Sequence, residues 1–123
     1  MKQIKILIVD DHQLVLDGLK AIINSEPEFD LIGDANNGKE ALRFIEHLKV
    51  DVVLLDIDMP EMNGIEATKV IKREHPEKKV LILTMHDEPA MIKELLAIGA
   101  DGYILKNSDR GESRGRRQAI LKR

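Results

Sequence analysis

Five polar side chains in this sequence stand at the C-terminal ends of apolar runs. The run KILIVDD (5–11) ends in Asp10 and Asp11, VVLLD (52–56) in Asp56, VLILT (80–84) in Thr84 and GYILK (102–106) in Lys106. If the carboxylates meet, each pair at ~4 Å repels by roughly 4 kcal/mol at an effective dielectric near 20. They must therefore bind a cation, bind protons or lie further apart.

Oxygen ligands suit a hard divalent ion, and a site with so few of them leaves room for water and a phosphoryl oxygen. Such coordination, by few protein ligands together with water and a phosphoryl oxygen, is typical of Mg²⁺ rather than of Ca²⁺. A carboxylate can also attack phosphorus, and a hydroxyl and an ammonium group can stabilise the charge of a transferring phosphoryl group. The residue types thus indicate phosphoryl chemistry at an acidic, magnesium-binding site.

The elements that carry these residues alternate between strands and helices. Strands are expected at Ile4–Val9, Phe29–Gly33, Asp51–Leu55, Val80–Leu83 and Gly102–Leu105. Helices are expected at Gln13–Asn24, from Gly38 onward, at Ile65–Glu74 and at Pro89–Ile98. Apolar strands without alternation, joined by helical crossovers, predict a parallel sheet covered on both faces.

The predicted fold class is α/β, a doubly wound five-stranded parallel sheet of flavodoxin-like order 2-1-3-4-5. Ligands bind outside the carboxyl ends of such strands, where the order reverses between the first and third. Asp10, Asp11 and Asp56 would meet there. Asp34, after the second strand, would fall on the far side of the first strand and outside the site.

Helical periodicity predicts the side chains that face the core. The expected inward residues are Val15, Leu19 and Ile22 in the first helix, Ala41, Leu42, Ile45 and Leu48 in the second, and Ile92, Leu95 and Leu96 in the fourth.

Composition fits one globular domain: 43% of residues are apolar, 33% are charged and none is cysteine. The apolar runs fall far short of the ~18–20 residues that a membrane span needs, and no signal peptide is apparent. We therefore expect a cytoplasmic protein that makes no membrane contact. The body of the chain is acidic, which argues against nucleic-acid binding by this domain. The basic residues at 108–123 are expected to be a solvated terminus.

Four motifs make residues 3–107 similar to the receiver domain of two-component response regulators. They are DD at 10–11, D-I-D-M-P-x-M-N-G at 56–64, L-T at 83–84 and G-A-D-G-Y-I-L-K at 99–106. The segments DDHQLVLDGL, NGKEAL and LTMHDE most resemble those of response regulators of the NarL/FixJ type. The resemblance implies a signalling domain whose output is transcription through a DNA-binding domain, which these 123 residues are not expected to include.

The resemblance also implies roles for the acidic residues. Asp56 would accept a phosphoryl group from a sensor histidine kinase. Asp11 would bind Mg²⁺ directly, Asp10 would act mainly through water, and the backbone carbonyl of Asp58 would be a further ligand. Such a domain is not an enzyme in the usual sense, and only self-phosphorylation and self-dephosphorylation are expected of it.

The same resemblance assigns switching roles near the site. Thr84 would bond the phosphoryl group when the domain switches, Lys106 would pair with that group or with Asp56, and Tyr103 would turn inward in the active state. His12 follows Asp11 and could be taken for a metal ligand, but it is predicted to be a solvent-facing neighbour at the start of a helix.

Two other function classes compete with this interpretation. A haloacid-dehalogenase-type aspartyl-phosphate phosphohydrolase also carries a D-x-D motif, which D-I-D at 56–58 matches, although Pro60 stands where those enzymes have Thr or Val. A protein-interaction module with a vestigial site is disfavoured because no site residue is missing.

The tail SDRGESRGRRQAILKR (108–123) departs from the receiver pattern. Gly111 and Gly115 each disfavour a helix by about 1 kcal/mol, and no apolar stripe is present. We predict a receiver domain at 1–107 and a poorly ordered basic tail at 108–123, with the final helix absent or degraded. The flank of the first helix, with Leu14, Leu16 and Ile23 as candidates, would then be uncovered, and the chain would self-associate.

Overall fold

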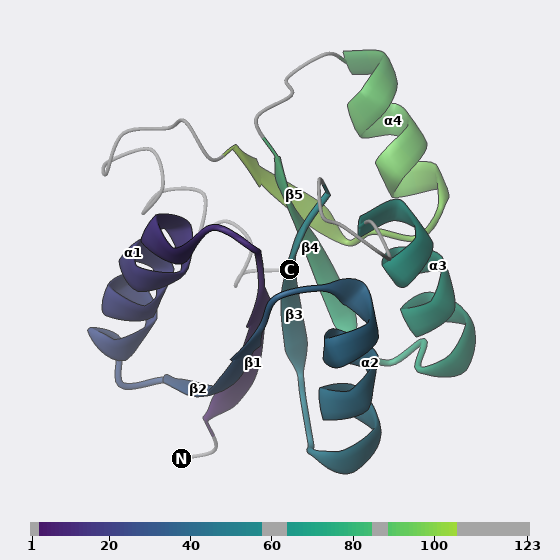
Figure 1. Ribbon diagram of the computed structural model, residues 1–123. Helices are drawn as coiled ribbons and strands as arrows, with labels where there is room; N and C mark the ends of the chain where they lie inside the picture. Colours follow the sequence, from purple (N-terminus) through teal and green to yellow (C-terminus); the bar gives the residue numbers. More distant parts are fainter. Residues whose placement is uncertain (1–2, 58–63, 85–88, 106–123) are drawn as a thin grey trace.

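The computed structural model describes residues 3–57, 64–84 and 89–105 (Figure 1). The strands are β1 Ile4–Val9, β2 Phe29–Ala35, β3 Val52–Asp56, β4 Lys79–Thr84 and β5 Gly102–Leu105. The helices are α1 Gln13–Asn24, α2 Gly38–His47, α3 Gly64–Glu74 and α4 Pro89–Ala97. Strands and helices therefore alternate along the chain in the predicted order.

The sheet has the order β2-β1-β3-β4-β5, and every strand pair is parallel. Figure 1 shows α2, α3 and α4 on one face of the sheet and α1 on the other. The predicted doubly wound α/β class and its 2-1-3-4-5 order are confirmed. The strand order reverses between β1 and β3. The carboxyl ends of these two strands therefore form the crevice in which such sheets bind ligands.

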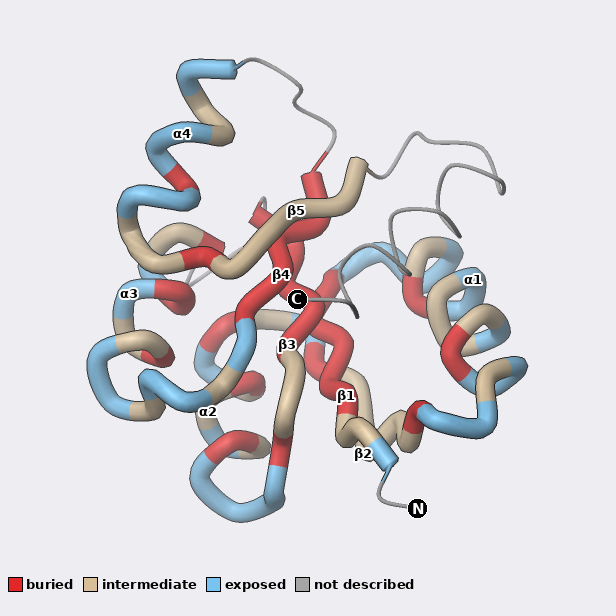
Figure 2. Tube along the Cα trace, turned by 180° about the vertical axis from the view of Figure 1, so that it is seen from behind, coloured by how far each residue is buried: buried red, intermediate tan, exposed pale blue. Residues whose placement is uncertain are grey.

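Two layers of apolar side chains hold the sheet between the helices, and Figure 2 shows the buried residues concentrated in its central strands. The larger layer joins the α2, α3 and α4 side of the sheet and includes Leu7, Leu55 and Ile71. The smaller layer lies on the α1 side and includes Ile8 and Leu16. Because β1, β3 and β4 contribute to both layers, they are apolar without alternation.

The predicted inward face of α1 is wrong in detail. Its buried residues are Leu16 and Ile23, whereas Val15 and Ile22 are only half-buried. Leu16 and Ile23 therefore belong to the core and not to an uncovered flank, which corrects that expectation. Leu14 alone of the three candidates is exposed, at 86%.

Two further predictions about helix faces are also wrong. Leu48 ends α2 as its C-cap and is 46% exposed, and Leu96 in α4 is 43% exposed. Of the other inward residues of α2, Ala41 and Ile45 are buried as predicted, and Leu42 is half-buried against the larger apolar layer. The start of α2 is fixed by Asn37, whose side chain accepts a hydrogen bond from the Glu40 backbone N–H at 2.9 Å.

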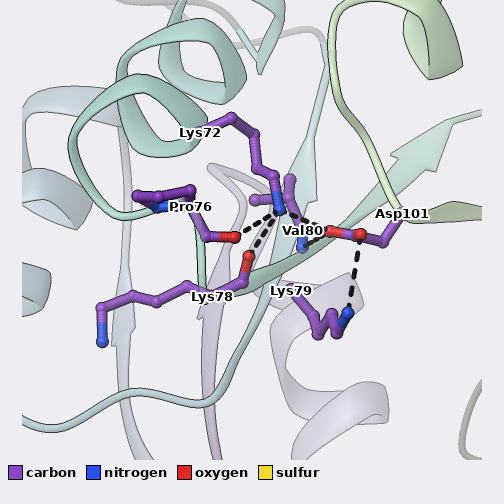
Figure 3. A network of polar contacts seen from close by, with 6 residues as sticks. All are labelled: Lys72, Pro76, Lys78, Lys79, Val80 and Asp101. Atoms are coloured by element: carbon purple, nitrogen blue, oxygen red, sulfur yellow. Dashed lines mark hydrogen bonds and ion pairs between the residues drawn. The ribbon is translucent and has the colours of Figure 1, made fainter.

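A polar network ties α3 to the start of β5, at the opposite end of the sheet from the carboxyl ends (Figure 3). The Lys72 ammonium donates to the carbonyls of Pro76 and Lys78, at 3.2 and 2.9 Å. It also donates to Asp101 Oδ2 at 3.1 Å. The same carboxylate oxygen accepts the Val80 backbone N–H of β4 at 2.9 Å. One charged pair thus joins α3, β4 and the residue before β5.

We expect Lys72→Met to lower the free energy of unfolding by about 1–3 kcal/mol, because three acceptors lose a charged donor. Lys79→Met is the matched control. Its ammonium lies 4.0 Å from the other oxygen of Asp101 and is largely exposed, so the loss should stay within about 0.5 kcal/mol. Urea unfolding of both variants measures the difference. Equal losses would show that Asp101 is not held by Lys72 in particular.

Among the described residues, no helix is long and apolar enough to cross a membrane. The predictions about the final helix and the tail 108–123 fall on residues outside those described.

Candidate functional site

Asp10 is held at the end of β1 by its main chain. Its backbone N–H donates to the carbonyl of Ala35 in β2 at 3.0 Å, and its side chain is fully buried. The Oδ1 atom accepts the backbone N–H of His12 at 2.9 Å, where the chain turns into α1. The turn between β1 and α1 therefore fixes the direction of this carboxylate.

Asp56 is the last residue of β3 and is only 1% exposed. Its strand pairs with β4 up to Leu83, and the Ile57 N–H donates to the Leu83 carbonyl at 3.2 Å. The start of α3 lies against this strand end, since the Gly64 N–H donates to the Ile57 carbonyl at 3.0 Å. Asp56 is thus positioned by strand pairing on one side and by a helix start on the other.

Asp10, Asp11, His12 and Asp56 converge into one cluster. Each offers a ligand atom, and these four atoms all lie within 4.8 Å of one another. Asp11 and His12 are exposed residues, whereas Asp10 and Asp56 are buried. The sequence prediction that Asp10, Asp11 and Asp56 meet at the switch point is confirmed.

The chemistry of this donor set fits a magnesium ion. Carboxylates at such separations repel strongly, and the repulsion grows where burial excludes water. Two buried and one accessible carboxylate supply only hard oxygen ligands, as Mg²⁺ prefers, and the open side leaves positions for water. Asp10, Asp11 and Asp56 could therefore hold the ion.

Thr84 and Tyr103 occupy neighbouring strands beside this cluster. Thr84 ends β4, one residue beyond the cross-strand partner of Asp56, and it is buried. Tyr103 pairs with Ile82 in the β4–β5 ladder and is half-buried against the larger apolar layer. The other predicted site residues, Asp58 and Lys106, lie outside the described residues.

His12 is exposed, as the sequence predicted, but its ring also lies beside the acidic cluster. Its side chain is 59% exposed, yet Nδ1 lies 3.0 Å from Asp10 Oδ1 and 3.2 Å from Asp11 Oδ1. The signal was present in the sequence, because a residue that begins a helix directly after two acidic residues can fold back onto them. The helix position predicted the exposure of the ring but not its contact with Asp10 and Asp11.

Asp34 lies outside the site, as predicted. It sits in β2, on the other side of β1, and its carboxylate pairs with Lys20 of α1 at 2.7 Å. The hydrogen bond that the Lys20 ammonium donates to Asp34 raises the pKa of Lys20 above its ordinary value. This ion pair links Asp34 of β2 to α1.

Comparisons with known proteins agree with this geometry. The family model for the response regulator receiver domain matches residues 6–116. The transcriptional regulatory protein DegU of Brevibacillus brevis is 43% identical over 107 residues, which cover 87% of this chain and 45% of DegU. The chain spans about half the length of the curated relatives it matches.

Solved structures show the same likeness. The signal receiver domain of NarL from Mycobacterium tuberculosis superposes with a TM-score of 0.88 at 30% identity, with 100% of both chains covered. A chain of the CheX–CheY–BeF₃–magnesium complex from Borrelia burgdorferi gives a TM-score of 0.87 at 30% identity, covering 98% of this chain and 90% of that one.

These matches decide between the function classes that the sequence left open. The sequence motifs indicated regulators of the NarL/FixJ type, and these relatives confirm that resemblance. The phosphohydrolase alternative is set aside because the match covers most of the chain with a signalling family. With its sheet order, its acidic cluster and these relatives in agreement, this chain belongs to the response regulator receiver domain family of two-component systems.

Proposed function

We propose that this domain accepts a phosphoryl group on Asp56 from the phosphohistidine of a sensor histidine kinase. The observation that carries the proposal is the placement of Asp56. It is buried at the end of a central strand, with the Asp10 and Asp11 carboxylates that follow β1 at one side and Thr84 at the end of β4 at the other. An acceptor in this position has anionic groups for a metal ion and a hydroxyl for the phosphoryl oxygens within one crevice.

In the transfer, a carboxylate oxygen of Asp56 attacks phosphorus, and the bond between phosphorus and the kinase imidazole nitrogen breaks. The nitrogen keeps the bonding electron pair, and the product is an acyl phosphate. Asp10 and Asp11 would hold Mg²⁺ beside Asp56, with the backbone carbonyl of Asp58 as a further ligand in this proposal. The ion would supply positive charge to the phosphoryl oxygens.

Switching is proposed to follow from the same crevice. The Thr84 hydroxyl donates to a phosphoryl oxygen, Lys106 pairs with the group or with Asp56, and Tyr103 turns further inward. Support comes from Thr84 and Tyr103 lying on adjacent paired strands, β4 and β5. A movement of Thr84 toward the phosphoryl group would shift β4, and the hydrogen bonds between β4 and β5 would pass that shift to Tyr103.

We propose that the receiver unit occupies residues 1–107 and that 108–123 is a basic tail, although the family match extends to residue 116. The output we propose is transcription, through a DNA-binding domain other than this one, in the cytoplasm. DegU supports this, since it is named a transcriptional regulatory protein and is longer than this chain.

We expect millimolar Mg²⁺ to raise the midpoint of thermal unfolding, because an ion that binds only the folded state stabilises it. At a tenfold excess over Kd the gain is about 1.4 kcal/mol. Asp11→Ala should remove the gain. Asp34→Asn is the matched control, since Asp34 lies outside the cluster, and it should keep the response. A parent protein whose midpoint ignores Mg²⁺ would contradict the metal site.

We propose that the chain self-associates through the α1 side of the sheet, because α1 is the only described helix on that face (Figure 1). Leu54, Leu81 and Leu83 of that face are buried, so the uncovered area is smaller than the sequence indicated, and Leu14 is the exposed apolar residue that remains on α1.

Sedimentation at micromolar concentration tests this self-association. We expect a dimer that Leu14→Glu converts to a monomer. Leu48→Glu, which alters an exposed leucine on α2, should leave the dimer intact. A monomeric parent chain would rule the interface out.

A further inference from the structure

The ring of His12 turns toward the acidic cluster although little of it is packed. Its side chain is 59% exposed, and Nδ1 faces three carboxylates, at 3.0 Å from Asp10 Oδ1, 3.2 Å from Asp11 Oδ1 and 3.9 Å from Asp56 Oδ2. Because no burial forces this orientation, polar attraction to the cluster determines it.

The ring is not needed to satisfy Asp10. The backbone N–H of His12 already donates to Asp10 Oδ1 at 2.9 Å, and this bond alone sets the turn into α1. The imidazole therefore adds a second nitrogen at the same oxygen. Without an ion, Nδ1 is hydrogen-bonded to this oxygen at 3.0 Å. When a metal ion takes the place of the shared hydrogen, the nitrogen lone pair lies beside three carboxylate oxygens, which is the composition of a mixed nitrogen and oxygen metal site.

The spacing of the four atoms also fits ligands around one ion. With bonds of about 2.1 Å, adjacent ligands of an octahedral ion are about 3.0 Å apart and opposite ligands about 4.2 Å apart. The distances from Nδ1 to Asp10 and Asp11 match adjacent positions, and the distance to Asp56 approaches an opposite one.

We propose that His12 Nδ1 is a further protein ligand of this site and that it shifts the metal preference from Mg²⁺ toward first-row transition ions such as Ni²⁺. The inference rests on the metal site proposed above and deepens it. Imidazole nitrogen binds these softer ions well, whereas Mg²⁺ favours oxygen. A site with His12 in place binds both classes, and the nitrogen ligand benefits mainly the transition ion.

The test is isothermal titration of the 123-residue chain with NiCl₂ and, separately, with MgCl₂. In His12→Ala we expect the Ni²⁺ dissociation constant to rise at least ~10-fold, as loss of a ligand does, and the Mg²⁺ constant to change less than ~2-fold. His12→Asn should resemble His12→Ala with Ni²⁺, because it replaces the ring nitrogen with an amide. His47→Ala, an exposed histidine on α2, is the matched control and should bind both ions like the parent.

A second readout addresses the bond itself. Electron spin-echo spectra of the Mn²⁺-loaded parent should show coupling to a directly bound nitrogen, which His12→Ala abolishes and His47→Ala retains. Equal losses of Ni²⁺ and Mg²⁺ affinity, no loss of Ni²⁺ affinity, or tighter Mg²⁺ binding in His12→Ala would each overturn the assignment while leaving the carboxylate site standing. Failure of the parent chain to bind either ion would overturn the metal site and this inference together.

Discussion

Asp56→Asn should abolish phosphorylation by acetyl phosphate and Mg²⁺, seen by intact-mass measurement as the loss of the added phosphoryl mass. An amide has no anionic oxygen to attack phosphorus, and Asp56 is the carboxylate at the buried end of β3. The fold should survive because asparagine has the shape of aspartate. Removing one of the clustered charges should also raise the free energy of unfolding measured without Mg²⁺, since the carboxylates repel each other.

The control for this experiment is Asp34→Asn, which alters a carboxylate near the same end of the sheet but on the far side of β1. It should gain the phosphoryl group as the parent does, and hydroxylamine should release that group as expected of an acyl phosphate. A phosphoryl group that still appears on Asp56→Asn under the same conditions would show that another residue is the acceptor.

Gly64→Ala should be the most damaging small substitution near the site. A Cβ at Gly64 would lie 2.6 Å from the Asp56 carbonyl oxygen and 2.6 Å from Ile57 Cα. These are backbone atoms of β3 and the residue after it, which cannot rotate away, so α3 or the strand end must shift. Overpacking of this kind costs about 1–3 kcal/mol or more. Because the shift displaces Asp56, the rate of phosphorylation should fall as well.

Gly18→Ala is the matched control for Gly64→Ala. Gly18 lies in the middle of α1, and a Cβ there would meet nothing within 4 Å. Alanine should therefore stabilise the protein by about 0.5–1 kcal/mol through its better helix propensity. Urea unfolding of both variants gives the comparison. Shifts of the same sign at the two positions would contradict the close approach of α3 to the strand end.

The sequence predicted the site well because strand ends are easy to recognise. Apolar runs such as KILIV and VLIL indicate buried strands in a chain of alternating strands and helices. Parallel pairing of these strands then brings the polar residues at their ends to one edge of the sheet. β1 and α1 have the predicted bounds, while β2 runs two residues further, to Ala35. That extension arises from pairing with β1, in which Val9 opposes Ala35, and local sequence does not report such pairing.

The errors concern directions of side chains rather than positions of elements. The core side of α1 follows Leu16 and Ile23, seven residues apart, because the angle at which the helix crosses the sheet selects among several apolar residues. Leu96 is apolar and correctly spaced for the inner face of α4, yet it is exposed. The exposure of His12 was predicted correctly, but its contact with the cluster was not predicted, since that contact depends on carboxylates that only the folded sheet brings together.

The strand order also has a consequence for how the chain folds. Because each strand pair is parallel, a pair can form only after the crossover segment that joins its two strands has been synthesised. The pairing of β1 with β3, together with Asp10, Asp11 and Asp56, uses only the first half of the chain. β4 and β5, which carry Thr84 and Tyr103, come afterward. On a ribosome the carboxylates can therefore meet before the strands that complete the switch are synthesised, and a divalent ion bound at that stage would stabilise a half-built sheet.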